Sequence, residues 1–414
     1  MREIIKQVIF EQKNPKKERL VVRSFPKELE TCNEIVVISG IRRCGKSVLL
    51  TQIRNRQNDK DFFMNFDDER LINFKVEHFQ LLHESFIELF GEQKIFYFDE
   101  IQNIPQWERF VRRLYDSGYK VFVTGSNATM LSRELGTHLT GRFCSFELFP
   151  FSFQEFLEIK DIHLEYQDYF TTSGRAKIKS NFDEFFEKGG FPINLQQEND
   201  LFLKSLYESI IYRDVMVRNK LTNEREIFEL VNYLCSNVSR LSTYSSLAKI
   251  IGIKNPTTIS NYIGYLQNSY LLFQVSKFDY SLKKQAQNPR KSYFIDNALI
   301  NKLAFSFSDN IGHLLENLVF IELKRKGFEI YYHKQKLECD FLIKKGNNID
   351  QAIQVCAFFN NPETKEREIN GLIEALNTYE LDSGHIITMD AEENIEVKEK
   401  KIEVKPAWKW LLNI

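Results

Sequence analysis

The sequence has little glycine or proline and no closely spaced cysteines. Its 414 residues include only 17 Gly and 9 Pro, which excludes collagen-like and Pro/Gly-rich low-complexity chains. The six cysteines form no C-x-x-C pair, so the pattern predicts neither a zinc ribbon nor a redox motif. Their low density also argues against a secreted disulfide scaffold.

Excess charge of one sign and long apolar runs are also absent. The 56 Lys and Arg nearly balance 57 Asp and Glu, giving a formal net charge of −1, which excludes a general polycation but not a local basic face. Residues 1–6 lack the apolar core of a signal peptide. The longest uncharged run, 255–276, is too polar to span a bilayer. We therefore expect a soluble cytoplasmic protein without a membrane segment.

Aromatic residues are plentiful, with 36 Phe and 17 Tyr, and the chain is long enough to bury sizeable cores. At about 150 residues per domain the length predicts two or three domains. We expect an N-terminal helix and basic linker at 1–30, an α/β domain at 31–200, a helical and winged-helix domain at 201–290, and an α/β domain at 291–414.

The α/β domain alternates short apolar runs with helical stretches, which predicts a mostly parallel sheet. The expected strands are Ile35–Ser39, Phe62–Asn65, Ile95–Phe98, Val121–Thr124 and Ser145–Leu148.

Residues 40–47 form G-x-x-x-x-G-K-S between an apolar strand and an apolar helix start. The glycines let backbone N–H groups wrap a phosphate chain, and the helix N-terminus adds a favourable dipole. Lys46 would reach the β- and γ-phosphates, and the Ser47 hydroxyl would bind Mg²⁺. The alternative is a Gly-rich turn with a chance lysine. The residues expected to bind ATP are Gly40, Arg42, Arg43, Cys44, Gly45, Lys46, Ser47 and Val48.

A second apolar strand ends in two carboxylates, Asp99 and Glu100. Asp99 would hold Mg²⁺, directly or through water, and Glu100 would orient and activate the attacking water. Adjacent side chains on a strand point to opposite faces, which suits two separate roles. Alone, such a pair is also typical of a solvated strand edge. Its place after the glycine-rich loop, in the same α/β pattern, favours the catalytic interpretation.

Two further residues are candidates for the reaction. Asn127 follows an apolar strand and could contact the γ-phosphate or the attacking water, although an Asn turn after a strand is common. Arg142 could stabilise transition-state charge in a neighbouring subunit. It could equally form a structural ion pair.

Together these segments resemble an AAA-type P-loop ATPase. The resemblance is to one prokaryotic family of AAA ATPases fused to a C-terminal domain of unknown function, and it covers nearly the whole chain. It implies an ATPase, a winged-helix segment and then a fold resembling restriction endonucleases, but no biological purpose. The runs that carry it are DEIQ (99–102), TGSN (124–127), LTGR (139–142), FPFSFQEF (149–156), GGFP (189–192), YRD (212–214) and YFID (293–296).

The winged-helix prediction rests on two helices within 242–268. Ser242 or Thr243 would cap the first, Gly252 would end it, and Asn255 and Pro256 would begin the second. A DNA-reading helix is expected to be basic, yet residues 256–268 carry no charge. The basic residues lie beside it: Lys249, Lys254, Lys277, Lys283, Lys284, Arg290 and Lys291, against Asp279. DNA contact and a structural or protein-docking role stay open.

A restriction-type site needs a carboxylate from a helix, an Asp at one strand, and Glu-x-Lys on the next, so that the acids bind Mg²⁺. Glu316 and Asp340 could supply the first two. The third position has Gln354 and Cys356, and cysteine cannot replace the lysine's charge. We therefore expect a nuclease-like fold without phosphodiesterase activity. The alternative is a low-activity nuclease with relocated groups.

The sequence thus predicts an α/β P-loop NTPase domain followed by winged-helix and nuclease-like parts. The expected activity is Mg²⁺-dependent ATP hydrolysis coupled to the C-terminal region. A nucleotide-gated DNA- or protein-binding switch with slow hydrolysis, of a defence-related kind, is the alternative, and an ATP-regulated DNA nuclease is a third. A trans-acting Arg142 would require a homo-oligomer.

Overall fold

The computed structural model describes residues 1–13, 21–56, 61–127, 139, 141–196, 200–304 and 311–414. They divide into two compact units, one made of 1–149 with 268–270 and the other of 150–267 with 271–414. No described helix is both long and apolar enough to cross a bilayer. The domain boundary predicted near residue 200 falls inside the second unit.

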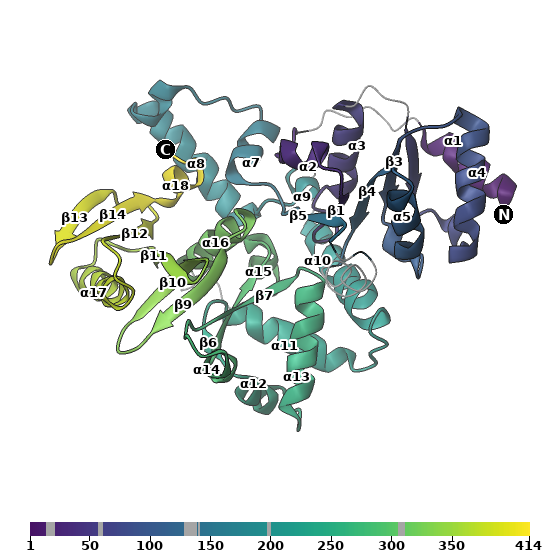
Figure 1. The fold of residues 1–414 in the computed structure, drawn as a ribbon. Helices are drawn as coiled ribbons and strands as arrows, with labels where there is room; N and C mark the ends of the chain where they lie inside the picture. Colours follow the sequence, from purple (N-terminus) through teal and green to yellow (C-terminus); the bar gives the residue numbers. More distant parts are fainter. Residues whose placement is uncertain (14–20, 57–60, 128–138, 140, 197–199, 305–310) are drawn as a thin grey trace. The chain divides into compact units, whose positions relative to one another are not determined.

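A parallel sheet with strand order β2-β3-β4-β1-β5 forms the centre of the first unit (Figure 1). The strands are β1 (Ile35–Ser39), β2 (Phe62–Asn65), β3 (Ile95–Asp99), β4 (Lys120–Gly125) and β5 (Phe143–Glu147). All five predicted strands are confirmed, although β5 begins earlier than predicted because Phe143 already pairs with Ile35. Since β4 lies between β1 and β3, the carboxyl ends of the three strands that carry the predicted site are neighbours.

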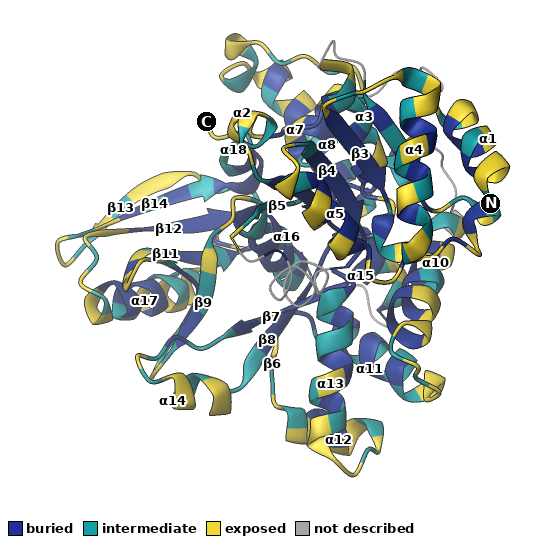
Figure 2. Ribbon diagram, turned by 45° about the vertical axis from the view of Figure 1, so that its right-hand side comes forward, coloured by how far each residue is buried: buried dark blue, intermediate teal, exposed yellow. Residues whose placement is uncertain are grey.

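Helices cover the sheet because successive side chains of each strand point to opposite faces. On one face Ile35, Phe96 and Val121 share a buried core with residues of α1 (Arg2–Gln12), α4 (Phe79–Phe90) and α5 (Trp107–Asp116). The intervening side chains include Tyr97 and Phe122, whose rings stack 5.0 Å apart, and α3 (Lys46–Arg56) contacts β3 and β4. Figure 2 shows β3 and β4 buried along their length. The short helices are α2 (Lys27–Thr31), η1 (Glu69–Leu71), η2 (Val76–His78) and η3 (Ile101–Asn103).

The second unit begins with a helical stretch. Its elements are α7 (Phe153–Ile159), η5 (Tyr166–Tyr169), α8 (Thr172–Lys188), α9 (Pro192–Gln196), α10 (Asp200–Ser209), the π-helical η6 (Ile210–Val217) and α11 (Glu224–Ser236). The long apolar face of α11 is buried through Ile227, Leu230 and Leu234, at the spacing expected of an amphipathic helix.

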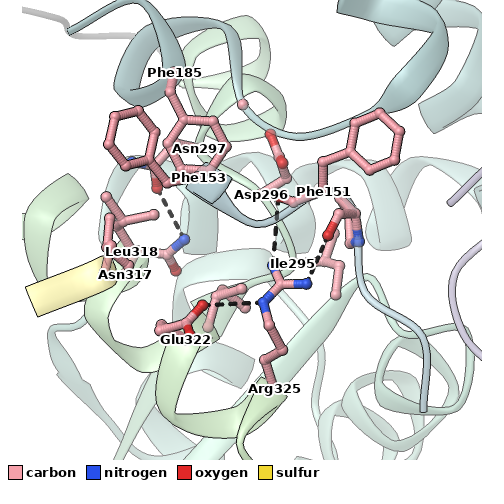
Figure 3. A pocket seen from close by; sticks show the side chains of 14 residues that line it. Phe151, Phe153, Phe185, Ile295, Asp296, Asn297, Asn317, Leu318, Glu322 and Arg325 are labelled. Carbon is pink, nitrogen blue, oxygen red and sulfur yellow. Dashed lines mark hydrogen bonds and ion pairs between the residues drawn. The ribbon is translucent and has the colours of Figure 1, made fainter. Parts of the chain in front are cut away.

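A buried polar cluster in this unit joins segments that lie far apart in the sequence (Figure 3). Asp296 accepts a hydrogen bond of 2.7 Å from the backbone N–H of Gly190, whose carbonyl accepts one of 2.7 Å from Phe151. Arg325 donates to the carbonyl of Pro150 at 2.8 Å. Three of the runs that carry the family resemblance therefore meet here. In the structure these three runs are linked to one another by hydrogen bonds.

Next comes a small antiparallel sheet of order β6-β8-β7, accompanied by helices. Thr243 caps α12 and Gly252 ends it with a φ of 80°, while the Asn255 side chain accepts from the N–H of Thr257 at the start of α13. The predicted helix boundaries are thus confirmed. The elements are β6 (Leu241–Ser242), α12 (Tyr244–Ile251), α13 (Pro256–Asn268), β7 (Leu272–Ser276), α14 (Leu282–Gln287), β8 (Arg290–Phe294) and α15 (Asn297–Leu303).

The chain then forms a mixed sheet of order β13-β14-β12-β11-β10-β9. An antiparallel meander, β9 (Glu329–Lys334), β10 (Glu338–Lys345) and β11 (Asn348–Cys356), is followed by α17 (Pro362–Thr378) and the parallel strand β12 (Ser383–Thr388). Near the C-terminus β13 (Glu393–Val397) and β14 (Lys400–Pro406) pair as an antiparallel hairpin. The helices α16 (Ile311–Arg325) and α18 (Ala407–Leu411) complete the unit.

Candidate functional site

The predicted phosphate loop links β1 to α3 and has backbone conformations that favour glycine. Gly40 has a φ of +149°, and a Cβ there would lie 2.1 Å from the carbonyl oxygen of Leu148. Gly45 has a φ of +102°, in a region that side chains rarely adopt. Because α3 begins at Lys46, the N–H groups of its first turn face the loop rather than an earlier turn of helix. The backbone is therefore arranged to bind an anion.

Lys46 is buried inside this loop, with 4% of its surface exposed. Its Nζ donates to the carbonyl oxygens of Gly40 at 3.2 Å and Ile41 at 3.1 Å. It also lies 3.6 Å from Oε1 of Glu100. The structure thus brings the lysine of the loop and the second carboxylate of β3 together, although they are far apart in the sequence.

Asp99 ends β3 with its carboxylate almost fully buried. Its Oδ1 accepts a hydrogen bond of 2.5 Å from the Thr124 hydroxyl on β4. Burial raises the pKa of Asp99, while hydrogen bonds from Thr124 and Ser47 oppose that rise. Both residues predicted to bind the metal, Ser47 and Asp99, are therefore in contact before any ion binds.

Glu100 lies at a sharp turn after β3, with a left-handed φ of 52°. Its N–H donates to the Thr124 hydroxyl at 2.9 Å, so one threonine holds both carboxylate residues. Gln102 donates to the Glu100 carboxylate and to Ser126 Oγ, the latter at 3.4 Å. The turn therefore directs a carboxylate that is still partly accessible, with 17% of its side chain exposed, toward the end of β4.

The remaining predicted nucleotide-binding residues surround this centre. Arg43 is exposed and has a φ of 67°, and Arg42 and Val48 are half-buried. The side chain of Cys44 is fully buried, which raises the pKa of its thiol. Cys44 can therefore serve a ligand only through its backbone. Asn127 follows β4 and is 7% exposed, and its role as a sensor stays a prediction.

Arg142 lies at the opposite end of the sheet from the phosphate loop. Its carbonyl accepts from the N–H of Ile35 at 2.9 Å, at the start of β1, whereas the loop follows the end of β1. Its guanidinium forms an ion pair of 3.3 Å with Asp116. This geometry supports the structural ion pair within one chain and leaves catalysis by Arg142 as a prediction about a neighbouring subunit.

Arg23 is a residue of this site that sequence reasoning missed. Its guanidinium is 2% exposed and donates to the carbonyls of Cys44 at 2.6 Å and Phe149 at 2.7 Å. It thereby ties the phosphate loop to the segment after β5. In the sequence Arg23 was one of several basic residues in a linker, and no local pattern distinguished it.

Tyr270 also contributes to the first unit, although it follows α13 in the sequence. Its hydroxyl donates to Ser39 Oγ at 2.6 Å, directly before Gly40. A left-handed φ of 62° holds the tyrosine in a sharp turn. No sequence signal pointed to this contact.

The second unit contains the residues compared above with a restriction-type site. Glu316 on α16 and Asp340 on β10 lie close together, as the pattern predicted. Between them lies a lysine that the pattern did not identify: Nζ of Lys291 is 2.9 Å from Glu316, 2.8 Å from Asp340 and 2.8 Å from Glu338. Gln354 accepts from the Asp340 N–H at 3.1 Å. The positive charge missing at Cys356 is thus present, but it comes from β8.

The charges of this carboxylate cluster depend on one another. Burial opposes the charge of Lys291, but Asp340 and Glu316 outweigh it and raise the pKa of the lysine. Burial and the nearby Glu316 raise the pKa of Asp340. Glu316 and Asp340 line an open cavity of about 570 Å³, together with Gln354, Cys356 and Glu368. An anionic or metal-bound ligand therefore has room beside the cluster.

Comparisons with known proteins match two family models. The AAA domain matches residues 32–157, and a domain of unknown function, DUF8612, matches 179–310. The chain is 37% identical to "Uncharacterized protein MJ1544" of Methanocaldococcus jannaschii, over 99% of this chain and 96% of that protein. It is 30% identical to an uncharacterized protein of Haemophilus influenzae, over 83% of this chain and 87% of that one.

Among solved structures, the chain is similar to the STAND protein PH0952 from Pyrococcus horikoshii, with 16% identity and a TM-score of 0.27 over 75% of this chain and 46% of that one. It is also similar to AMPPCP-bound DnaA from Aquifex aeolicus, with 15% identity and a TM-score of 0.26 over 58% and 84% of the two chains.

Proposed function

Because this chain belongs to the AAA-domain family that includes uncharacterized protein MJ1544, and its first unit is an AAA-type P-loop α/β domain, we propose that it is an Mg²⁺-dependent ATPase. The convergence of Lys46, Asp99 and Glu100 at the end of one sheet is the observation that supports this most directly. ATP is the substrate, and nucleotide state is coupled to the C-terminal region.

The donor set at this edge fits Mg²⁺. The ion prefers oxygen ligands and keeps several waters, and Asp99 and Ser47 offer a carboxylate and a hydroxyl already in contact. When bound, the ion neutralises charge that develops on the phosphates. Lys46 would exchange its bonds to the loop carbonyls for phosphate oxygens, which are stronger acceptors for an ammonium.

Glu100 would orient and deprotonate the attacking water. Its backbone N–H is fixed by Thr124 and its carboxylate by Gln102, so the group is held in place before substrate arrives. A positioned general base of this kind contributes about 100-fold or more to a rate. Asn127, at the end of the neighbouring strand, would contact the γ-phosphate or the water.

The test is the variant Glu100→Gln, which removes the base and keeps the shape of the side chain. We expect it to bind a fluorescent ATP analogue with near wild-type affinity and to hydrolyse ATP about 100-fold or more slowly. Lys46→Ala should instead lose nucleotide binding. Glu69→Gln, an exposed change in η1, is the matched control and should leave both measurements unchanged. Wild-type turnover by Glu100→Gln would overturn the assignment.

A nucleotide-gated switch is the alternative within the same family. The helices α12 and α13 with the sheet β6-β8-β7 have the element order of a winged helix, and a cavity of about 360 Å³ beside α13 is lined by Thr257, Ser260 and Arg290. Lys291, counted among the basic residues of this region, is 2% exposed and bound to carboxylates, so it is not available to DNA phosphates.

This alternative is tested by measuring ATP turnover with and without duplex or single-stranded DNA. A higher turnover rate in the presence of DNA favours a DNA-coupled protein. The stimulation should then decrease steeply as the salt concentration increases. An unchanged rate favours a protein partner or a homo-oligomer.

A low-activity nuclease is the third candidate, favoured by the position of Lys291 among Glu316, Glu338 and Asp340. We expect slow nicking of supercoiled plasmid with Mg²⁺ or Mn²⁺ that is lost in Asp340→Asn. No nicking by the wild-type protein would remove this candidate. Nicking that persists in the variant would identify a contaminant.

A further inference from the structure

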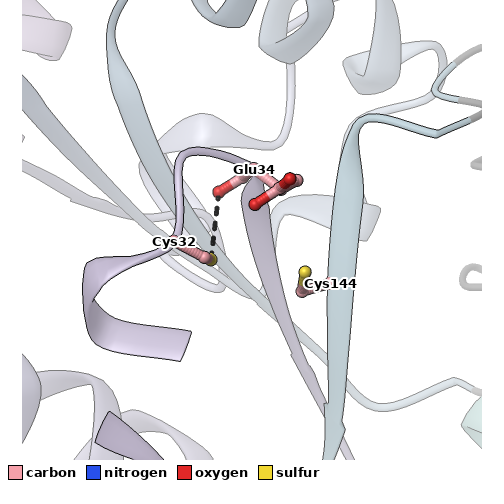
Figure 4. Close-up of side chains that lie close together, drawn as sticks. All are labelled: Cys32, Glu34 and Cys144. Carbon is pink, nitrogen blue, oxygen red and sulfur yellow. Dashed lines mark hydrogen bonds between the residues drawn. The ribbon is translucent and has the colours of Figure 1, made fainter. Parts of the chain in front are cut away.

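A second cluster of metal-ligating side chains lies in the first unit, away from the phosphate loop (Figure 4). Cys32 and Glu34 belong to the segment that leads into β1, and Cys144 lies on the neighbouring strand β5. One ligand atom from each, two sulfurs and one carboxylate oxygen, lies within 4.8 Å of the other two. All three side chains are half-buried, so an ion can reach them.

We propose that Cys32, Glu34 and Cys144 form a binding site for a thiophilic divalent cation, with Zn²⁺ as the expected ion. Zinc takes Cys sulfur at about 2.3 Å and carboxylate oxygen at about 2.0–2.2 Å, so ligand atoms around one tetrahedral ion lie about 3.5–3.8 Å apart. The three ligand atoms lie within 4.8 Å of one another, so rotations of the half-buried side chains that close each gap by about 1 Å reach that geometry. Two sulfur ligands select zinc over magnesium or calcium, which prefer oxygen alone.

Lys120 holds the segment in position. Its Nζ donates to the backbone carbonyls of Cys32 and Glu34, the latter at 2.8 Å, and lies 3.3 Å from the Cys32 sulfur. With both thiols ionised, the ion and Lys120 together carry three positive charges against three negative ones, so the occupied cluster is neutral.

The site joins the segment before β1 to β5, at the end of the sheet where Arg142 lies and away from the phosphate loop.

The test uses the full chain, reduced and freed of metal, titrated with Co²⁺ as a spectroscopic substitute for Zn²⁺. We expect a sulfur-to-cobalt charge-transfer band and visible d–d bands that saturate at one ion per chain and disappear when Zn²⁺ is added. Cobalt at Ser47 and Asp99 would give no sulfur band, which separates this site from the nucleotide site.

Variants assign the ligands. Cys32→Ser and Cys144→Ser should each weaken binding at least tenfold, and the double variant should lose the sulfur band. Glu34→Gln should keep the band with weaker affinity. Cys356→Ser, which changes a thiol of the second unit, is the control and should titrate like wild type.

A measurement on the wild-type protein guards against variants that fail to fold. Cys32 and Cys144 are half-buried, whereas the other four cysteines are buried, so Zn²⁺ should slow the alkylation of these two residues relative to the metal-free protein, as read by peptide mass. The proposal is overturned if the reduced protein shows no sulfur-to-cobalt band or if the band persists in the double variant. It is also overturned if peptide masses show that Cys32 and Cys144 form a disulfide that persists in the presence of reductant.

Discussion

At the scale of single residues, the phosphate loop depends on a side chain outside its motif. Arg23 donates two charge-assisted hydrogen bonds to carbonyls of Cys44 and Phe149. Arg23→Ala would leave both oxygens buried without these donors, which should lower the free energy of unfolding by about 2–4 kcal/mol and weaken ATP binding about tenfold or more.

Thermal unfolding and titration with a fluorescent nucleotide measure the two effects of Arg23→Ala. Arg56→Ala is the matched control, because Arg56 forms a surface pair with Glu30 and such pairs contribute about 1 kcal/mol or less. Unchanged nucleotide affinity in a folded Arg23→Ala protein would show that the loop keeps its shape without this arginine.

Asp296 makes the second unit sensitive to pH. Burial raises its pKa to about 6, and the N–H groups of Gly190 and Ala298 offset only part of that rise. An unfolded aspartate titrates near about 4, so the folded protein binds this proton more tightly. Its contribution to stability is therefore greatest below pH 4 and decreases as pH rises to about 6, by about 3 kcal/mol in all.

The variant Asp296→Asn isolates this effect. The amide has one acceptor oxygen and cannot accept from both N–H groups, so the variant loses the same amount of unfolding free energy at every pH. The pH-dependent part disappears, so the unfolding free energy of the wild type should decline relative to that of the variant between pH 4 and 7. Urea denaturation across this range measures the difference, and parallel curves would contradict the prediction.

At the scale of elements, β4 positions the end of its neighbour β3 and the turn that follows it. The hydroxyl of Thr124 donates to Asp99 and accepts from the N–H of Glu100. Thr124→Val keeps the shape and the β-branched side chain but removes both bonds, so Asp99 becomes harder to ionise and the turn at Glu100 loosens. We expect the ATPase rate constant to fall about 10- to 100-fold with little change in fold.

Thr124→Ser is the matched control, because it keeps the hydroxyl and should retain most of the activity. Steady-state kinetics at saturating Mg²⁺ and ATP compare the three proteins. A valine variant that is as active as wild type would mean that substrate, rather than Thr124, positions the carboxylates.

The elements also show what a sequence can reveal. The strands of the first unit and the caps at Thr243 and Asn255 follow from local patterns, apolar runs and side chains that bind nearby N–H groups, so they could be predicted. The phosphate loop is equally local. Lys291 and Arg23 could not be predicted as parts of a site, because their partners come from strands and loops far along the chain. The Glu-x-Lys pattern places the lysine of a restriction-type site at position 356, where this chain has Cys356. In the structure the lysine beside the carboxylates is instead Lys291, on β8.

At the scale of the whole molecule, a single chain does not bring all of the predicted catalytic residues together, because Arg142 lies away from the phosphate loop of its own chain. β1 separates Arg142 from the phosphate loop, and its five residues span about 15 Å at roughly 3.3 Å each. Arg142 therefore cannot reach its own loop without breaking the pairing of Ile35 with β5. A catalytic Arg142 must act on another copy of the chain, which makes activity a property of an assembly.

This requirement leads to a test by concentration and by mixing. If Arg142 acts in trans, specific ATPase activity rises with protein concentration. Arg142→Ala and Glu100→Gln are each inactive alone, but their mixture regains activity, because the intact Glu100 of one chain meets the intact Arg142 of the other. If Arg142 only pairs with Asp116, specific activity is independent of concentration and mixing gives no more than the sum. Asp116→Asn then reproduces the small stability loss of Arg142→Ala, which thermal unfolding of the two variants would show.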